Sequence, residues 1–245
     1  MNPRPFMLAV AGLVLAALSS GCTESLDPDA GLDDGAAVPQ IFDPVEGRCE
    51  EAGQGRGDAF ADCVEQFSPA PAVSFGHDAM PSIVLGPPAG AGTGMGSMDV
   101  ASLGCGGSIT LHFSEPWPVD IPGPDFIVFE NPFVAGDSTF VEPGQVSVSA
   151  DGDNWRVFDC EPDGSPEAPP SCAGLRPVLA SDGTAATAVD TAGGDAFDLA
   201  DVGLDYARYV RIEDRTAEHY DSETWCAGAA GGFDLDAVAV VGDNR

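Results

Sequence analysis

The amino-acid sequence predicts an all-β domain of the β-sandwich or jelly-roll class that is cross-linked by disulfide bonds. Short segments that are apolar or alternate between apolar and polar residues recur beyond residue 70, and residues that favour turns separate them. No long apolar run at the 3.6-residue helical period follows the amino-terminal segment. Six cysteines follow that segment, and an even number is typical of an exported, disulfide-bonded domain.

The amino-terminal segment has the features of a bacterial lipoprotein signal peptide. Arg4 precedes an apolar run that is too short to span a bilayer. The run ends in Leu-Ser-Ser-Gly before Cys22, which resembles a lipobox. We therefore expect residues 1–21 to be removed and Cys22 to be lipidated, which would anchor the protein in the cell envelope without a spanning helix. An ordinary signal peptide followed by a chance cysteine is the alternative.

The residues after Cys22 predict a tether and then one domain. Thr23 follows the cysteine where an aspartate would favour retention at the inner membrane, so we expect the outer membrane or the cell surface. Residues 22–45 are rich in Asp, Gly, Ala and Pro, which predicts a flexible acidic tether. Residues 46–245 are expected to form a single β-sandwich domain.

The cysteine spacing favours one set of disulfides. Six cysteines allow about 15 pairings. Short separations favour Cys49–Cys63 and Cys160–Cys172, which leaves Cys105–Cys226. A metal site built from these thiols is the alternative, but the sequence has no CxxC pair of the kind that zinc sites use.

The predicted strands follow one another through the domain. Residues 108–113 alternate between polar and apolar, as in a half-buried strand, whereas residues 126–129 are apolar on both faces, as in a strand covered from both sides. Residues 145–150 alternate again and lead through the turn signal 151–154 into a returning strand at 155–158. Residues 209–212 and 235–241 complete the series.

Composition excludes several classes of function. The chain of 245 residues has a formal net charge of −31, its nine basic residues are all arginine, and it contains no lysine. We therefore expect no nucleic-acid partner, because the chain lacks the cations that neutralise phosphates. It also lacks a lysine for a Schiff base or a P-loop. No HExxH or GxSxG motif is present, so we do not expect an enzyme; an extracellular hydrolase is a further alternative.

Several segments between residues 57 and 243 resemble a group of uncharacterised bacterial cell-surface proteins whose domain is similar to galactose-binding-like, discoidin-type jelly rolls. The matching segments lie at residues 60–62, 84–88, 102–104, 106–111, 123–131, 146–152, 194–200, 209–212 and 231–238. The resemblance implies a galactose-binding-like jelly roll and a place at the cell surface, but no established activity. The cysteines that lie in or beside these segments are additions to the pattern of the group.

Acidic residues near the carboxyl terminus suggest a calcium site. Asp234 and Asp236 lie two apart in a predicted strand with apolar residues on both faces, so we expect at least one of them to be partly buried. Without lysine, a buried carboxylate needs backbone N–H groups, a proton or a hard cation, and calcium prefers oxygen ligands. Galactose-binding-like domains often carry an edge calcium, which by resemblance points to Asp236 and Asp234, then to Glu130 and Asp62. Solvated surface acids, or another metal, are the alternatives.

Aromatic residues suggest a ligand-binding surface. Proteins bind sugars through exposed Trp and Tyr rings and a few polar groups. The candidates are Trp117, which lies in a proline-rich loop and is expected to be exposed, together with Tyr220 and Trp225. Trp155 is expected in the core because of its strand position. These features predict a lipid-anchored binding module for a glycan or another envelope polymer. A structural envelope protein that makes only protein contacts is the alternative.

Overall fold

The computed structural model divides the chain into residues 1–37 and residues 38–245, and the described residues all lie in the second unit. They are residue 49 and residues 57–94, 96–161 and 172–242. The expected signal peptide, Cys22 and the tether lie outside the described residues. In the described part of the chain, no helix is long and apolar enough to cross a membrane.

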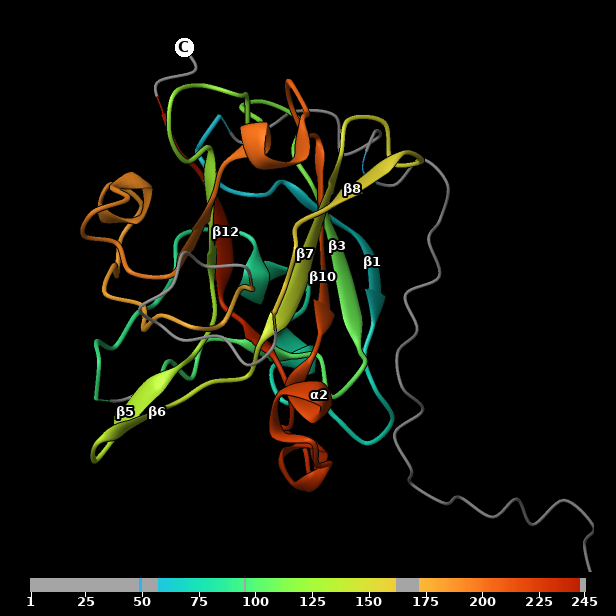
Figure 1. Ribbon diagram of the computed structural model, residues 1–245, viewed down its shortest axis with the longest axis vertical. Coiled ribbons are helices and arrows are strands. Elements are labelled where there is room, and N and C mark those ends of the chain that lie inside the picture. Colours follow the sequence, from blue (N-terminus) through green and yellow to red (C-terminus); the bar gives the residue numbers. More distant parts are fainter. Residues whose placement is uncertain (1–48, 50–56, 95, 162–171, 243–245) are drawn as a thin grey trace, which may run out of the picture. The chain divides into compact units, whose positions relative to one another are not determined.

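One side of the unit is an antiparallel sheet with the strand order β1-β3-β10-β7-β8 (Figure 1). Its strands are β1 (Cys63–Ser68), β3 (Ser108–His112), β10 (Tyr209–Asp214), β7 (Gly144–Ser149) and β8 (Trp155–Val157). The alternation in these segments separates the two faces, since Ile109, Leu111, Val210 and Ile212 all enter the main core. The opposite face carries the residues between them.

A second antiparallel sheet has the order β12-β4-β9, and its central strand is apolar and buried on both faces. Its strands are β12 (Ala237–Val240), β4 (Phe126–Phe129) and β9 (Asp195–Phe197). Phe126 and Val128 of β4 pack in the main core with the five-stranded sheet, whereas Ile127 and Phe129 pack in a second cluster with residues 178–192. The expectation of a strand covered on both sides is therefore confirmed for β4, which lies in the middle of its sheet.

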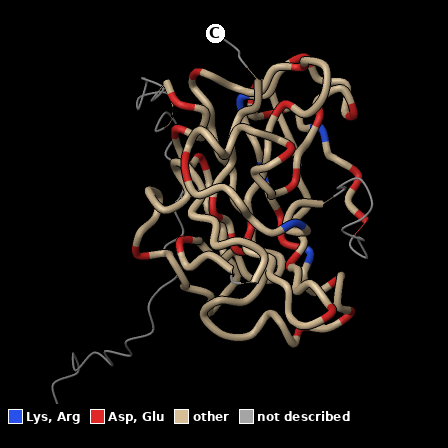
Figure 2. The backbone as a smooth tube through the Cα atoms, turned by 90° about the vertical axis from the view of Figure 1, so that its left-hand side faces the viewer, with Lys and Arg blue, Asp and Glu red and all other residues tan. Residues whose placement is uncertain are grey.

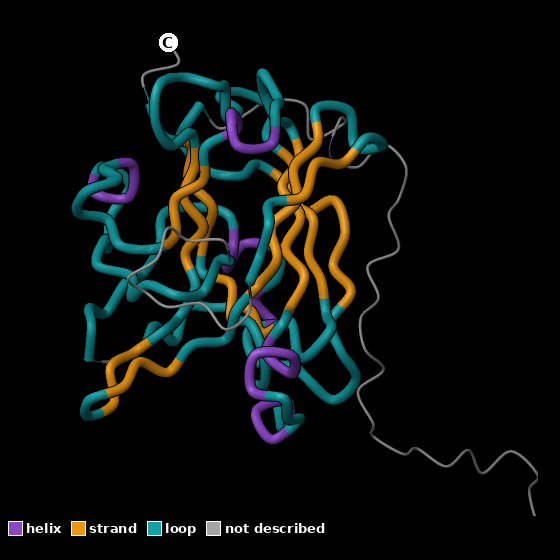
Figure 3. The backbone as a smooth tube through the Cα atoms, in the orientation of Figure 1, coloured by secondary structure: helices purple, strands orange, loops and turns teal. Residues whose placement is uncertain are grey.

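Short elements complete the described part of the chain, and long loops join them (Figure 3). Two small antiparallel pairs are formed by β2 (Ala101–Ser102) with β11 (Asp234–Leu235) and by β5 (Phe133–Ala135) with β6 (Ser138–Phe140). The only described α-helix with assigned bounds is α2 (Thr216–Tyr220), and the 3-10 helices are η1 (His77–Ala79), η2 (Ser82–Val84), η3 (Ala185–Thr187), η4 (Leu199–Val202) and η5 (Thr224–Cys226). The unit is thus strand-rich with few helices, as the sequence predicts.

The three disulfide pairs follow the predicted pairing. Cys49–Cys63, Cys105–Cys226 and Cys160–Cys172 have Cα–Cα distances of 5.6, 5.3 and 4.7 Å, within the range that disulfides require. The disulfide with the largest sequence separation, Cys105–Cys226, joins the loop before β3 to η5. It therefore connects segments 121 residues apart in the sequence.

Acidic residues far outnumber arginines throughout the described unit (Figure 2). Among the described residues only two ion pairs with arginine are formed, between Arg176 and Asp195 and between Arg215 and Glu218. Most carboxylates must therefore be neutralised by backbone N–H groups, solvent, protons or bound cations.

Candidate functional site

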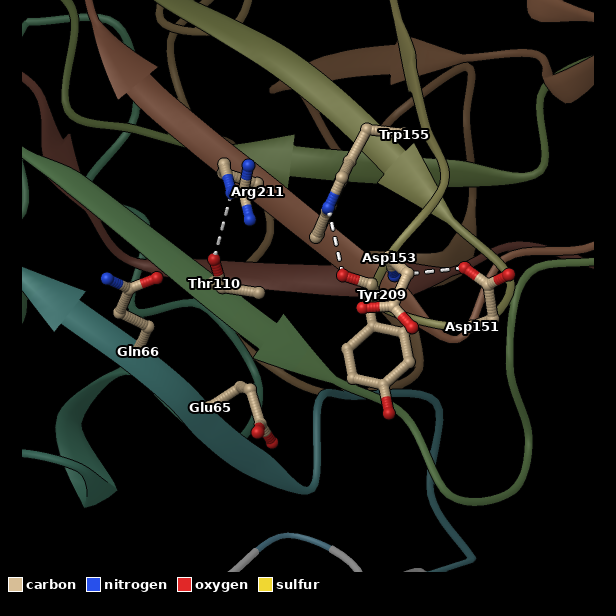
Figure 4. A pocket seen from close by; sticks show the side chains of 9 residues that line it. Glu65, Gln66, Thr110, Asp151, Asp153, Trp155, Tyr209 and Arg211 are labelled. Carbon is tan, nitrogen blue, oxygen red and sulfur yellow. Dashed lines mark hydrogen bonds between the residues drawn. The ribbon is translucent and has the colours of Figure 1, made fainter. Parts of the chain in front are cut away.

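A pocket of about 250 Å³ opens on the outer face of the five-stranded sheet (Figure 4). Four strands and one turn line it, through Glu65 and Gln66 of β1, Thr110 of β3, Tyr209 and Arg211 of β10, Trp155 of β8 and residues 151–153 of the β7–β8 turn. Strand alternation explains this lining, because Tyr209 and Arg211 flank the core residue Val210. The register completes it, since Arg211 lies opposite Thr110 and Thr110 lies opposite Gln66.

The aromatic and cationic side chains in the pocket are held in fixed positions. The guanidinium of Arg211 lies 3.8 Å from the centre of the Trp155 ring, and its Nε donates to the hydroxyl of Thr110 at 3.2 Å. The indole N–H of Trp155 donates to the carbonyl of Gly152 at 3.0 Å. Burial lowers the pKa of Arg211, and the charge of Glu213 partly offsets this lowering. The arginine remains charged, because a guanidinium is not deprotonated in proteins. The pocket thus offers a positioned cation beside two half-exposed rings.

The turn that closes one end of the pocket is organised by Asp151. Its carboxylate accepts hydrogen bonds from the backbone N–H groups of Asn154 and Asp153 and from the side chains of Asn154 and Ser149. These bonds, the backbone bond of Asn154 above all, hold the pKa of Asp151 well below its usual range. Asp151 is therefore an ionised turn-former and is unsuited to donate a proton as a general acid.

A second candidate site is a buried group of three acids. Glu130 follows β4, Glu142 precedes β7 and Asp234 begins β11. One carboxylate oxygen of each lies within 4.8 Å of the others, and the residues are only 1%, 7% and 6% exposed. Burial, followed by repulsion from neighbouring acids, raises the pKa of Glu142 to about 9 and that of Glu130 well above its ordinary value. Burial also raises the pKa of Asp234 to about 6, although hydrogen bonds from Ser102 and Asn131 oppose it.

The predicted calcium ligands are only partly brought together. Asp234 and Glu130 meet, as expected, but Asp236 is not in their group. Its two oxygens each accept the backbone N–H of Ala89 at 3.1 Å, and Ser97 adds a side-chain hydrogen bond. Asp62 accepts the backbone N–H of Ser114 at 2.7 Å, in a different part of the structure. Asp62 and Asp236 therefore do not join Asp234 in a common ligand set within the described residues.

The predicted aromatic residues divide between two places. Tyr220 and Trp225 have ring centres 5.8 Å apart, and Phe140 packs against both. Trp225 is 46% exposed, whereas the Tyr220 hydroxyl donates to the carbonyl of Val141. Trp117 lies elsewhere and packs against the main core, with Arg208 over its ring at 5.7 Å, so the expectation of an exposed Trp117 is only partly met.

Trp155 lines the pocket and belongs to none of the core clusters, so the expectation that it lies in the core is wrong. The residue that points inward at this end is Phe158, which directly follows β8 and packs in the main core. Trp155 and the 53%-exposed Val157 share the outer face. The period-two pattern of residues 155–158 contains this signal, because Phe158 and Trp155 fall on opposite faces.

The sequence interpretation assigns no functional role to Glu142, Tyr209 or Arg211. The alternation of Tyr209 and Arg211 with Val210 and Ile212 marks them as outward-facing, which is a usable signal. Glu142 lies in a loop before β7, where no periodicity applies, and only the fold brings it to Glu130 and Asp234.

A comparison with known proteins finds no matching family model, no matching curated protein and no matching solved structure.

Proposed function

We propose that this protein is a lipid-anchored binding module of the cell envelope, which recognises a glycan in the pocket on the outer face of the five-stranded sheet. The observation that carries the proposal is the pocket itself, where half-exposed rings stand beside side chains that can donate and accept hydrogen bonds. Sugar rings bind proteins through this combination, with C–H groups against aromatic faces and hydroxyls against polar side chains.

The polar groups around the pocket suit sugar hydroxyls. The terminal nitrogens of Arg211 form no hydrogen bond with another described residue, since its only such bond is made by Nε to Thr110. A partly buried guanidinium gains from acceptors that a ligand would bring. Gln66 and the carboxylates at the rim add acceptors and donors on the β1 side and the turn side. A short stretch of one or two sugar units fits the pocket volume.

Charge narrows the class of glycan. Glu65, Asp151 and Asp153 line the pocket together with a single cation, Arg211, on a chain of net charge −31. This surface would repel uronic acids and sulfated sugars, because like charges are disfavoured at short range. We therefore expect neutral sugars or amino sugars. The remaining elements of the proposal are the galactose-binding-like jelly-roll topology and the anchor at Cys22, which rest on the resemblance and on the lipobox.

A glycan array tests the proposal. The full chain is applied to neutral, amino and acidic oligosaccharides, in parallel with Trp155→Ala and with Trp225→Ala as the matched control from the other aromatic group. We expect binding to neutral or amino sugars that falls about tenfold or more in Trp155→Ala and persists in Trp225→Ala. The absence of any hit would favour a structural envelope protein. Loss in Trp225→Ala alone would move the site to Tyr220 and Trp225.

A further inference from the structure

No arginine among the described residues forms an ion pair with the group of Glu130, Glu142 and Asp234. The chain also has no lysine. Asp214 adds a fourth acid to their surroundings, since it is one of the charges that act on Glu142 and Asp234. Buried carboxylates without a partner cost several kcal/mol each, so something must neutralise this group.

The hydrogen bonds of the chain satisfy only part of the group. Glu142 accepts the backbone N–H of Gly232 at 2.9 Å, and Glu130 Oε1 accepts that of Asp234 at 3.2 Å. Asp234 accepts the hydroxyl of Ser102 and the amide of Asn131. Glu130 Oε2 has no hydrogen-bond partner among the described residues, although Glu130 is 1% exposed. A buried, unpartnered carboxylate oxygen beside two further carboxylates is a ligand position for a cation.

The other acidic group of the described residues provides a contrast. Asp120, Asp125 and Asp198 also bring carboxylate oxygens within 4.8 Å of one another. There, the two oxygens of Asp125 accept the backbone N–H groups of Ile121 and Leu199, and Asp198 accepts that of Ala200. Asp120 is exposed to solvent. That group is satisfied by the backbone and by water, so it gives no reason to expect an ion.

We propose that Glu130, Glu142 and Asp234 bind one calcium ion between β4, β7 and β11. Calcium lies about 2.4 Å from its oxygen ligands, so two ligands of one ion are at most about 4.8 Å apart, which is the limit within which these three oxygens fall. The ligands are all carboxylates. Such a set suits a hard cation and not zinc or copper, which favour histidine and cysteine. Backbone carbonyls and water would complete the shell.

The ion would join the segments after β4 and before β7 to β11, and Gly232 connects this site to the segment that carries Trp225. Gly232, which donates to Glu142, also donates to the carbonyl of Trp225 at 3.2 Å. Cys226, the next residue after Trp225, forms the disulfide to Cys105. Binding at Glu142 would therefore hold this segment through Gly232, in addition to relieving repulsion in the interior.

Calorimetric titration of the chelator-treated full chain with calcium chloride tests this site. We expect one ion per chain, and affinity at least about tenfold lower in Glu130→Gln and in Glu142→Gln, which keep the shape of each side chain but remove its charge. Asp120→Asn, from the satisfied acidic group, is the matched control and should bind as the parent does. Terbium luminescence excited through Tyr220 and Trp225 gives a second readout of the same site.

Thermal unfolding separates loss of the site from loss of the fold. In chelator, the two Gln variants should melt no lower than the parent, because each loses a buried charge. In millimolar calcium only the parent and Asp120→Asn should gain melting temperature. No binding by the parent at millimolar calcium would overturn the proposal and leave protons as the neutralising species. Undiminished binding in both Gln variants, or its loss in Asp120→Asn, would also overturn it.

Discussion

Removal of the Cys105–Cys226 disulfide should cost more stability than removal of any other cross-link in the described residues. In the chain-entropy model, a cross-link stabilises the fold by restricting the unfolded chain, and its effect grows with the length of the closed loop. The separation of 121 residues gives about 4.9 kcal/mol at 25 °C. The separation of 12 residues between Cys160 and Cys172 gives about 2.8 kcal/mol.

The two bridges can be removed independently as paired alanine variants, Cys105→Ala with Cys226→Ala and Cys160→Ala with Cys172→Ala. Alanine avoids a buried hydroxyl at Cys172, which is fully buried. Urea unfolding, followed by fluorescence and circular dichroism, gives the free energy of unfolding of each variant against the parent. The expected difference between the two variants is about 2 kcal/mol, with the 105–226 variant the less stable.

Equal losses in the two variants, or a larger loss in the 160–172 variant, would refute this reasoning. Such a result would mean that local packing, and not loop closure, determines what each bridge contributes. The slope of the free energy against urea gives a second check, because it should increase more in the 105–226 variant, whose unfolded chain expands more when the longer loop is opened.

Two further changes test the packing and the buried charges. Gly232→Ala should destabilise by about 2 kcal/mol or more, because Gly232 has φ +73° and an added Cβ would lie 2.7 Å from the backbone of Gly104. Gly203→Ala, with φ +66° and open space, should cost only about 1 kcal/mol in the same urea assay, and equal costs would contradict the close approach. Burial, opposed mainly by the backbone N–H of Leu175 and by Arg176, raises the pKa of Asp195 to about 7. The stabilising contribution of Asp195 is therefore complete below about pH 4 and is lost as pH rises through 7. Between pH 4 and 8, the free energy of unfolding measured in urea should fall less in Asp195→Asn than in the parent, and the two slopes should differ by at most about 1.4 kcal/mol per pH unit. If the free energy of unfolding falls equally with pH in the variant and the parent, titration of Asp195 does not contribute to the pH dependence of stability.

The strand pattern and the disulfides could be predicted because they depend on short-range information. Alternation at residues 108–112 separates Ile109 and Leu111, which lie in the core, from Thr110, which lines the pocket. The continuous apolar run of β4 likewise predicts its central place between two clusters. The two short cysteine separations restrict the third pair by elimination.

The candidate sites could be predicted only in part, because they depend on which loops meet. The sequence marks Asp234 and Glu130 as acids next to strands, but it does not place Glu142 beside them. Glu142 lies in a loop without periodicity, and its contact with Gly232 spans 90 positions in the sequence. The spacing of two residues and the resemblance to galactose-binding-like domains group Asp236 with Asp234. The sequence does not show that the backbone N–H of Ala89 donates to the buried carboxylate of Asp236 and so compensates its burial.

The most direct test of the proposed pocket uses the three tryptophans of the chain, Trp117, Trp155 and Trp225, as separate reporters. Uniform labelling with 5-fluorotryptophan, with one Trp→Phe variant for each assignment, gives three fluorine resonances that can be followed during titration with a neutral oligosaccharide from the array. The proposal predicts a saturable shift of the Trp155 resonance while those of Trp117 and Trp225 stay in place. A shift of the Trp117 or Trp225 resonance with that of Trp155 unchanged would contradict it.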